Sequence, residues 1–293
     1  MVVSDNRRSA PEIAAVLTFM DLTPLEQAEL FRSLHDPEHP LALSNAFDVA
    51  GAVVAEAAGA PAIATSSAGV AWSLGYPDGD RLGRVQALSV VAAIAGAVRV
   101  PVTADIEGGY GDAVPDVAET VRGVLDAGAV GINIEDGSRP PAEFAARIGA
   151  ARRVAEHAGL PLYINARTDV FLAGVVPPDR RRAETLARAA RYLDAGADGI
   201  FVPGVVDPDT IATLAGQLNA PLNIMVGPGA PSVAELGRLG VARVSLGSAV
   251  AQAAYATVRR ITRELYEHGT YRAASELIDF AELNTLMGRS SAP

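Results

Sequence analysis

The sequence of 293 residues contains neither cysteine nor lysine. Without cysteine the chain has no disulfides, no thiolate metal ligands and no thiol nucleophile. Because all 24 basic residues are arginines, a Schiff base between a lysine and a carbonyl substrate or pyridoxal cofactor is also excluded. The four histidines fall in helical or loop stretches rather than at the ends of predicted strands: His35, His39, His157 and His268. The chemistry left to this chain uses carboxylates, arginines, hydroxyls, amides or a metal ion.

The sequence also lacks an excess of positive charge and any long apolar run. Its net charge of −10 argues against binding to nucleic acid or to an anionic membrane. No apolar run approaches the ~20 residues of a membrane span, and we expect a cytoplasmic protein. A hydrophobic fraction of 49% is enough for a large core. We therefore predict one α/β domain over residues 11–293, preceded by a disordered tail over residues 1–10.

Short apolar runs alternate with alanine-rich segments of helical periodicity. The runs span residues 41–47, 61–67, 101–107, 130–136, 162–169, 199–205, 222–227 and 243–248. Several helical segments end in a glycine just before the next run: Gly59, Gly128, Gly159, Gly196 and Gly240. Eight strands alternating with helices indicate a (β/α)₈ barrel. The alternative is an open doubly wound sheet, but the sequence lacks a G-x-G-x-x-G fingerprint after the first strand.

Helical segments are also predicted at both ends of the chain. Residues 11–35 have a helical pattern, in which Thr23 and Pro24 are suited to the cap and first turn of a second helix. Residues 249–266 supply a helix after the last strand, and residues 270–288 supply another. This last segment could cap the barrel or reach into a neighbouring subunit.

Charged residues gather where the third, fourth and fifth predicted strands end. They are Asp105 and Glu107, then Glu135 and Asp136, then Arg167 and Asp169. The carboxyl ends of barrel strands meet at one mouth, and two-residue alternation places Asp105 and Glu107 on one side of their strand. Unpaired acids there would repel one another, and a hard cation such as Mg²⁺, or Mn²⁺ in its place, would remove that cost. The alternative is that the acids cap helices or pair with arginines.

Two further features at the predicted mouth suit an anionic ligand. Arg167 could orient a carboxylate or phosphonate through paired hydrogen bonds; alternatively, it forms a salt bridge that holds Glu135 or Asp169 in place. Ser66, Ser67 and Ala68 precede a glycine, and this small, flexible segment could offer backbone N–H groups to an anion.

Four segments together carry a family resemblance. They are SNAFDVAGAVVAEAAGAPAIATSSAGVAWSLGYPD (44–78), VTADIEGGYGD (102–112), GINIEDG (131–137) and NARTDVF (165–171). In this order and spacing they resemble the isocitrate lyase/phosphoenolpyruvate mutase superfamily from about residue 40 to 250. The resemblance implies a (β/α)₈ barrel whose eighth helix swaps between subunits of a homo-oligomer, usually a homotetramer and otherwise a dimer. It also implies Mg²⁺, with Mn²⁺ possible, and a small 2-oxo or 2-hydroxy carboxylate substrate.

The resemblance implies a role for individual residues as well. Asp105 matches the direct metal ligand of the superfamily, and Glu107, Glu135 and Asp78 match acids that hold the ion through water. Ser66, Ser67 and Ala68 match the segment that binds the substrate carboxylate, and Arg167 matches the anion-binding arginine. Position 107 is more often Asp in the superfamily, so Glu107 is a departure by one methylene group.

A larger departure follows Glu135. Lyases of the superfamily carry a Lys-Cys-Gly-His type segment there, whose cysteine is an acid/base on a mobile gating loop, and phosphonate-handling members carry a Lys-Thr-Asn-Ser type loop. This chain instead reads GSRPPAEFAARIGAARR over residues 137–153, a short loop that runs directly into a helix. Candidate replacements for the missing proton donor are Tyr110, Ser138, Arg139 and Glu143. We take Tyr110, Glu135 and Arg167 as the candidate catalytic residues.

Three functions are compatible with these residues. The first is a Mg²⁺-dependent lyase or hydrolase that cleaves a C–C bond of a small 2-oxo- or 2-hydroxy-dicarboxylate through an enolate intermediate. The second is a mutase or hydrolase acting on the C–P bond of a phosphonopyruvate-like substrate. The third is a catalytically idle barrel that binds a carboxylate metabolite.

Overall fold

Nine parallel strands form a nearly closed barrel in the computed structural model, which describes residues 22–290. The strands are β1 (Leu41–Leu43), β2 (Asn45–Ala46), β3 (Ile63–Thr65), β4 (Val102–Asp105), β5 (Gly131–Glu135), β6 (Tyr163–Arg167), β7 (Gly199–Val202), β8 (Leu222–Met225) and β9 (Val241–Ser245). Their order in the sheet is β1-β9-β8-β7-β6-β5-β4-β3-β2. The predicted barrel is confirmed.

The first predicted strand, over residues 41–47, is split into two short pieces. β1 pairs with β9, whereas β2 pairs with β3 on the other side. Ser44 lies between the two pieces. The split run therefore occupies a single strand position between β9 and β3, and the nine strands fill the eight positions of the predicted barrel.

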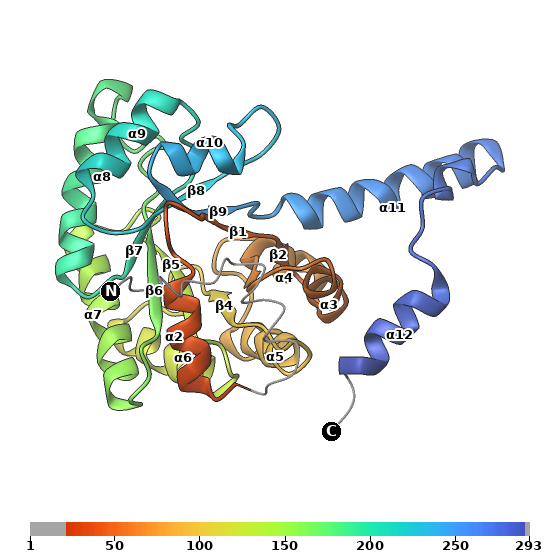
Figure 1. The fold of residues 1–293 in the computed structure, drawn as a ribbon, viewed down its shortest axis with the longest axis horizontal. Helices are drawn as coiled ribbons and strands as arrows, with labels where there is room; N and C mark the ends of the chain where they lie inside the picture. The colour runs from red at the N-terminus through yellow and green to blue at the C-terminus, as the bar shows by residue number, and fades with distance from the viewer. Residues whose placement is uncertain (1–21, 291–293) are drawn as a thin grey trace, which may run out of the picture.

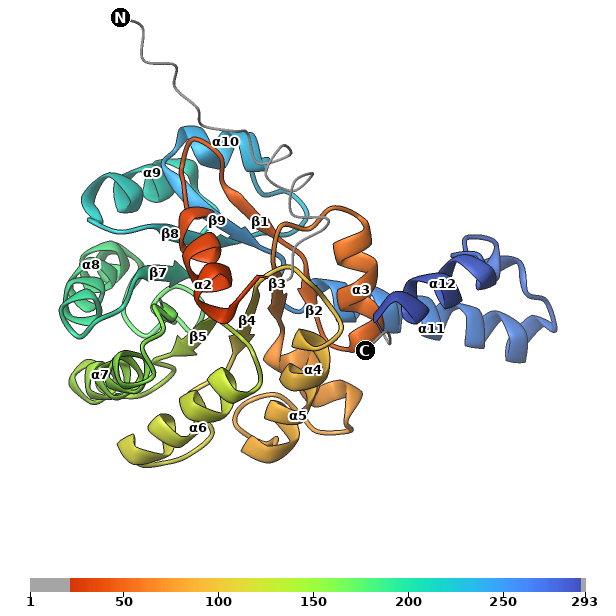
Figure 2. The same ribbon diagram turned by 60° about the horizontal axis from the view of Figure 1, so that its bottom comes forward.

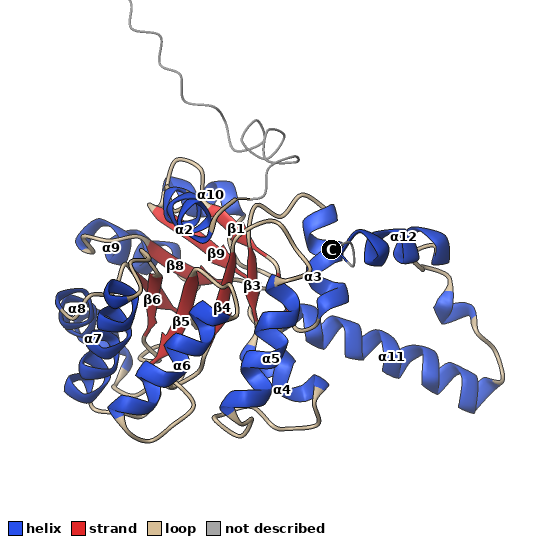
Figure 3. Cartoon of the chain, turned by 90° about the horizontal axis from the view of Figure 1, so that it is seen from below, coloured by secondary structure: helices blue, strands red, loops and turns tan. Residues whose placement is uncertain are grey.

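Helices surround the strands (Figures 2 and 3). They are α2 (Pro24–Ser33), α3 (Val49–Ala57), α4 (Ser67–Ser73), α5 (Arg84–Ala95), α6 (Val114–Asp126), α7 (Pro141–His157), α8 (Pro178–Asp194), α9 (Pro208–Gln217), α10 (Val233–Arg238), α11 (Ala249–His268) and α12 (Phe280–Ser290), with a 3₁₀ turn at Arg272–Ala274. The predicted tail over residues 1–10 and the first part of the predicted 11–35 helix lie outside the described residues. One domain over residues 11–293 stays a prediction.

The predicted helix boundaries have clear local causes. Thr23 and Glu26 form a reciprocal capping box at the start of α2, and Pro24 occupies the first turn. All five glycines predicted to end helices have φ between 68° and 107°. Only glycine adopts this left-handed backbone at little cost, which is why it terminates a helix before the next strand.

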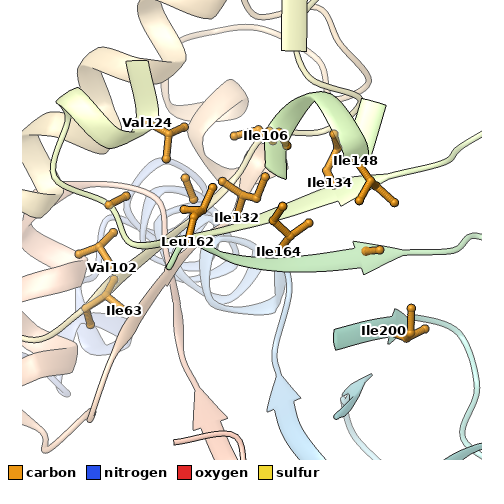
Figure 4. Close-up of a cluster of buried hydrophobic side chains, with 14 of the residues drawn as sticks. Ile63, Val102, Ile106, Val124, Ile132, Ile134, Ile148, Leu162, Ile164 and Ile200 are labelled. Atoms are coloured by element: carbon orange, nitrogen blue, oxygen red, sulfur yellow. The ribbon is translucent and has the colours of Figure 1, made fainter. Parts of the chain in front are cut away.

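Branched aliphatic side chains fill the layer between the strands and the outer helices (Figure 4). Ile132 and Ile134 of β5 and Ile164 of β6 are fully buried in this layer. Val124 of α6 and Ile148 of α7 belong to the same cluster from the helical side. Alternate residues of each strand thus pack against the outer helices, and the residues between them point into the barrel.

Helix α2 closes the amino-terminal end of the barrel. Its Phe31 is fully buried, with its ring edge-on to Tyr163 of β6 at 5.6 Å between centroids. His35 stacks on the same tyrosine at 3.8 Å, and burial lowers the pKa of His35 to about 3, so this histidine is a neutral packing residue. The carboxyl ends of the strands are left to form the mouth.

The C-terminal helices form an arm beside the barrel (Figure 1). Helix α11 extends away from the strands with only Ala251 buried, and α12 turns back to pack against α3. Helix α11 is thus slightly longer than predicted, and α12 is shorter, because a 3₁₀ turn and an irregular stretch precede it. Within residues 22–290, no helix has the length and apolar character needed to cross a membrane.

Removing the buried Phe31 side chain of α2 is expected to destabilise the fold. Phe31→Ala should lower the free energy of unfolding by about 3–5 kcal/mol, because it leaves a cavity between α2 and β6. Urea denaturation followed by circular dichroism measures this loss. Val85→Ala, at a position 78% exposed on α5, is the control and should change little. A Phe31→Ala protein as stable as the control would contradict this packing.

Candidate functional site

Asp105 is the last residue of β4 and is held by the neighbouring strand-to-helix turn. Its Oδ2 accepts hydrogen bonds from the Ser67 backbone N–H at 3.1 Å and from the Ser67 hydroxyl at 2.8 Å. The Asp105 N–H in turn donates to Thr65 Oγ1 at 2.8 Å. Residues of the β3–α4 turn therefore fix both the backbone and the carboxylate of Asp105.

The serines at this turn already have partners within the chain. Ser66 is the N-cap of α4, where its hydroxyl accepts from the Gly69 N–H at 3.3 Å. The backbone N–H and the hydroxyl of Ser67 both donate to Asp105, and Ala68 is buried in the first turn of the helix. The segment predicted to bind a carboxylate thus lies beside the predicted metal ligand.

Glu107 does not follow the alternation expected of its strand. The strand ends at Asp105, and Glu107 has a left-handed backbone with φ of 50°. Its side chain is nevertheless buried, with 2% exposed. The Asp80 N–H donates to its Oε2, whereas its Oε1 has no hydrogen-bond partner among the described residues. Two-residue alternation therefore does not describe Glu107, because the strand ends at Asp105; Glu107 nevertheless lies close enough for the Asp105 carboxylate to raise its pKa.

A buried arginine holds the glycine-rich loop that follows. Arg147 of α7 is 1% exposed and donates to the backbone carbonyls of Gly108 at 3.0 Å, Gly111 at 2.9 Å and Asp112. This tie was missed from the sequence. The available signal was an arginine between Phe144 and Ile148, two residues of the buried face of the same helix.

Tyr110 lies in this loop with φ of 52°. Its hydroxyl donates to the Asp105 carbonyl over 3.4 Å, which is a long hydrogen bond. Burial, together with the nearby Glu107 and Asp105 carboxylates, raises the pKa of Tyr110 well above its ordinary value. Tyr110 is therefore a neutral phenol beside the acids.

Arg167 connects the ends of β5 and β6. Its Nη1 lies 2.6 Å from Glu135 Oε2, in register across the two strands. Its Nε and Nη2 donate to the two Asp169 oxygens at 2.7 and 3.2 Å. The salt-bridge alternative considered for Arg167 is thus the arrangement present in this structure.

Asp136 faces away from the mouth despite its place at a strand end. It is fully buried and accepts hydrogen bonds from the Thr168 hydroxyl, the Asp169 N–H, Arg188 and the Tyr192 hydroxyl, at 2.8–2.9 Å. This carboxylate therefore ties the β5 end to the β6 end and to α8. These contacts fix the ends of β5 and β6, where Glu135 and Arg167 lie side by side.

A polar layer lies inside the barrel below the acids. Asn133 Oδ1 accepts from Asn165 Nδ2 at 2.9 Å and from Arg243 Nη2 at 3.1 Å. Arg243 is 1% exposed, and burial lowers its pKa to about 10. It remains a cation at neutral pH, and its charge acts on Asp105 above it.

Crowding and burial change the protonation of the acids. Burial, followed by the carboxylates of Asp80, Asp105 and Asp78, raises the pKa of Glu107 to about 7, although the hydrogen bond from the Asp80 N–H opposes this shift. Burial raises the pKa of Glu135 to about 8 although Arg167 opposes this shift. The pKa of Asp78 is raised by burial and by Asp105. The four predicted metal-binding acids therefore share one electrostatic environment.

This environment suits a hard divalent cation. All of its candidate ligands are oxygens, and Glu107 Oε1 is buried without a partner among the described residues. The pKa values of Glu107 and Glu135 are raised first by burial and then by neighbouring carboxylates, both of which a bound cation would offset. Oxygen ligation with retained water is typical of Mg²⁺, and Mn²⁺ accepts the same ligands.

A tighter group of metal-binding side chains lies elsewhere. Over residues 22–290, only Asp36, Glu38 and His39 bring ligand atoms within 4.8 Å of one another. They precede β1 in a largely exposed loop at the opposite end of the barrel. No three of the acids at the mouth bring their ligand atoms as close together in residues 22–290.

Comparison with known proteins agrees with this architecture. The family model for phosphoenolpyruvate phosphomutase matches residues 31–266. The chain belongs to the phosphoenolpyruvate phosphomutase family. This membership confirms the resemblance to the isocitrate lyase/phosphoenolpyruvate mutase superfamily.

Relatives in and around the phosphoenolpyruvate phosphomutase family match most of the chain. An uncharacterized protein of Mycobacterium tuberculosis is 41% identical over 225 residues, 74% of this chain and 81% of its own length. The oxaloacetate decarboxylase of Pseudomonas entomophila is 33% identical over 62% of this chain and 71% of its own. A crystal structure from Burkholderia cenocepacia J2315, provisionally described as a phosphonomutase, is 42% identical with a TM-score of 0.79, covering 83% of this chain and 99% of its own.

The buried acids predict how stability depends on pH without a metal ion. Because Glu107 and Glu135 titrate above the ~4.3 of an exposed glutamate, the folded state holds more protons than the unfolded state between about pH 5 and 8. Raising the pH through this window should lower the free energy of unfolding, by at most about 1.4 kcal/mol per pH unit for each group. Urea midpoints measured in EDTA test this.

Two controls isolate the contribution of these acids. The double variant Glu107→Gln, Glu135→Gln should have a flatter pH profile than the parent, and Glu38→Gln, an exposed control, should not. Saturating Mg²⁺ should stabilise the parent more at pH 8 than at pH 5, since protons compete with the ion. Parallel profiles for the parent and the double variant would contradict the assignment.

Proposed function

We propose that the protein is a Mg²⁺-dependent lyase or hydrolase that cleaves a C–C bond of a small 2-oxo- or 2-hydroxy-dicarboxylate. The observation that carries this proposal is the group of buried acids around Asp105, with raised pKa values at Glu107 and Glu135. A barrel without a bound cation gains nothing from such charge. Relatives named oxaloacetate decarboxylase and 2-methylisocitrate lyase support carbon–carbon bond cleavage.

In this proposal Asp105 binds the ion directly, while Glu107, Glu135 and Asp78 hold it through water. The bound ion would stabilise the negative charge that develops on a 2-oxo group when the neighbouring C–C bond breaks. Ser67 orients the Asp105 carboxylate through its two hydrogen bonds.

The substrate and the transferred proton are assigned to residues beside the acids. The Ser66–Ala68 turn receives the substrate carboxylate next to the ion, and Arg167 orients this same carboxylate from the β6 side. Tyr110 and Glu135 are the candidate proton donors to the carbon released by cleavage. Tyr110 is protonated throughout the neutral range, and burial raises the pKa of Glu135, which favours its protonated form although Arg167 opposes this shift.

Two alternatives rest on particular observations. The match to the phosphoenolpyruvate phosphomutase family favours C–P bond chemistry on a phosphonopyruvate-like substrate. The short segment between β5 and α7, without the superfamily's acid/base cysteine, favours a carboxylate-binding barrel without catalysis.

The cellular setting is part of the same proposal. We place the protein in the cytoplasm, acting as one unit over residues 11–293, without a nucleic-acid or membrane partner. We further propose a homodimer or homotetramer built by exchange of α11. Support comes from the exposed apolar side chains on this projecting helix, which include Val258 at 59% and Tyr266 at 81% exposed.

Turnover should depend on Mg²⁺ and on Asp105. Incubation with oxaloacetate, malate-type acids, methylisocitrate or phosphonopyruvate, followed for pyruvate, glyoxylate and phosphate, identifies the bond that breaks. Asp105→Ala should abolish turnover, and Ser67→Ala should cost about 10- to 100-fold in metal affinity or activity, as loss of an outer hydrogen bond to a ligand does. Asp209→Asn, an exposed acid on α9, is the control.

The products of this assay distinguish the three candidate functions. Phosphate release, or a shifted phosphonate signal in the ³¹P spectrum, would replace C–C cleavage by the C–P alternative. Metal-dependent carboxylate binding without turnover of any substrate would favour the idle barrel. Full activity in Asp105→Ala would remove the proposed metal site.

The assembly can be tested separately by light scattering. The parent protein should have the mass of a dimer or tetramer, and Val258→Glu with Tyr266→Glu should shift it to the monomer, because charge is costly in a buried apolar interface. Arg259→Ala on the same helix is the control. A monomeric parent at micromolar concentration would contradict helix exchange.

A further inference from the structure

Arg167 and Arg139 lie beside the acids, and they differ in the number of carboxylate oxygens that they contact. Each of the three guanidinium nitrogens of Arg167 lies within 3.2 Å of a carboxylate oxygen. Arg139, in the loop between β5 and α7, makes one ion pair, Nη2 to Asp80 Oδ2 at 3.3 Å. Its side chain is 22% exposed and that of Asp80 is 35% exposed. Such a partly exposed, single contact is weak and readily exchanged.

Arg139 is held next to the acids by its short loop. Its backbone N–H donates to the Asp136 carbonyl at 2.8 Å, and Pro140 and Pro141 follow it at the start of α7. Proline fixes φ, so the loop has little freedom to move away. Arg139 therefore extends from a fixed backbone position.

The guanidinium of Arg139 lies over Gly108, the residue after Glu107. A Cβ at Gly108 would overlap all three of its terminal atoms. The partner Asp80 is itself bonded through its backbone N–H to the Glu107 carboxylate. Arg139 is thus a cation at the edge of the proposed metal site, in a space that only glycine at position 108 leaves open.

Of the arginines Arg167 and Arg139, one is available to bind a second substrate carboxylate. A dicarboxylate brings two negative charges, and the proposed ion compensates the first. Arg167 is already paired with Glu135 and Asp169. Among the described residues Arg139 pairs with one acid, the exchangeable Asp80, and an arginine can hold a carboxylate through two parallel hydrogen bonds.

We infer that Arg139 binds the distal carboxylate of the substrate, which takes the place of Asp80 on its guanidinium. The inference rests on the proposed function and names the residue that distinguishes a dicarboxylate from a monocarboxylate. Arg139 supplies from a fixed loop a contact with the far end of the substrate, in a chain that lacks the superfamily's mobile loop. Selection for the second carboxylate then requires no loop closure.

The test compares two probes by calorimetry in Mg²⁺; if malate is itself cleaved, its KM from initial rates replaces its calorimetric affinity. Oxalate offers only the metal-binding unit, whereas malate adds a distal carboxylate. Arg139→Met should weaken malate binding by about 10- to 100-fold, as expected for a lost charged hydrogen-bonding pair, and should leave oxalate binding within about twofold. Arg122→Met, on the outer surface of α6, is the control.

Two further variants separate recognition from structural support. Gly108→Ala keeps every charge but displaces the Arg139 guanidinium, and it should reproduce the selective loss of malate affinity. Asp80→Asn retains the backbone N–H bonded to Glu107 and removes the competing carboxylate, so malate should bind more tightly. If the Arg139–Asp80 pair only stabilised the loops, Asp80→Asn and Arg139→Met would weaken binding alike.

The outcomes distinguish this inference from the proposed function. A parent protein that binds neither probe in Mg²⁺ overturns both. Mg²⁺-dependent oxalate binding, with malate affinity unchanged in Arg139→Met, overturns only the role of Arg139. Equal loss of oxalate and malate in Arg139→Met also overturns it, because the arginine would then support the metal site rather than read the distal carboxylate.

Discussion

Four carboxylates meet at one end of the barrel, and their mutual repulsion is the constraint to which the surrounding structure responds. Burial raises the pKa of Glu107 and Glu135 to about 7 and 8. Neutral donors orient the acids without cancelling their charge: Ser67 holds Asp105, and the Asp80 N–H holds Glu107. Only Glu135 has a direct cationic partner, Arg167. The remaining charge is available to a bound cation.

Two buried charges outside the mouth keep the acids in place. Arg147 donates to three carbonyls of the loop after β4, and Asp136 receives four hydrogen bonds from the end of β6 and from α8. A buried charge is tolerable only when such groups surround it. Arg147 and Asp136 therefore each fix the loop that they contact. The acids on these loops stay close to one another although their proximity is electrostatically unfavourable.

Much of the fold could be predicted from the sequence because its signals are local. Apolar runs separated by helices that end in glycine specify the barrel, and Asp105 lies at the strand end where its run places it. The left-handed turn at Glu107 and its hydrogen bond from Asp80, which is distant in the sequence, could not be predicted. The contacts of Arg147 with the loop after β4 are equally non-local, whereas the salt bridge of Arg167 is one of the two alternatives predicted. The split of the first strand at Ser44 depends on which neighbour each half pairs with.

The same constraint determines the order in which ligands enter. A mouth with four acids repels a dianionic substrate, and Arg167 offers little relief because Glu135 and Asp169 already neutralise it. A bound divalent cation would reverse the local sign of the potential and favour the ionised form of Glu107. In the proposed function, an anionic substrate would then have two cationic partners, the ion and Arg139. That function therefore requires cation binding before substrate binding on electrostatic grounds, whichever bond breaks.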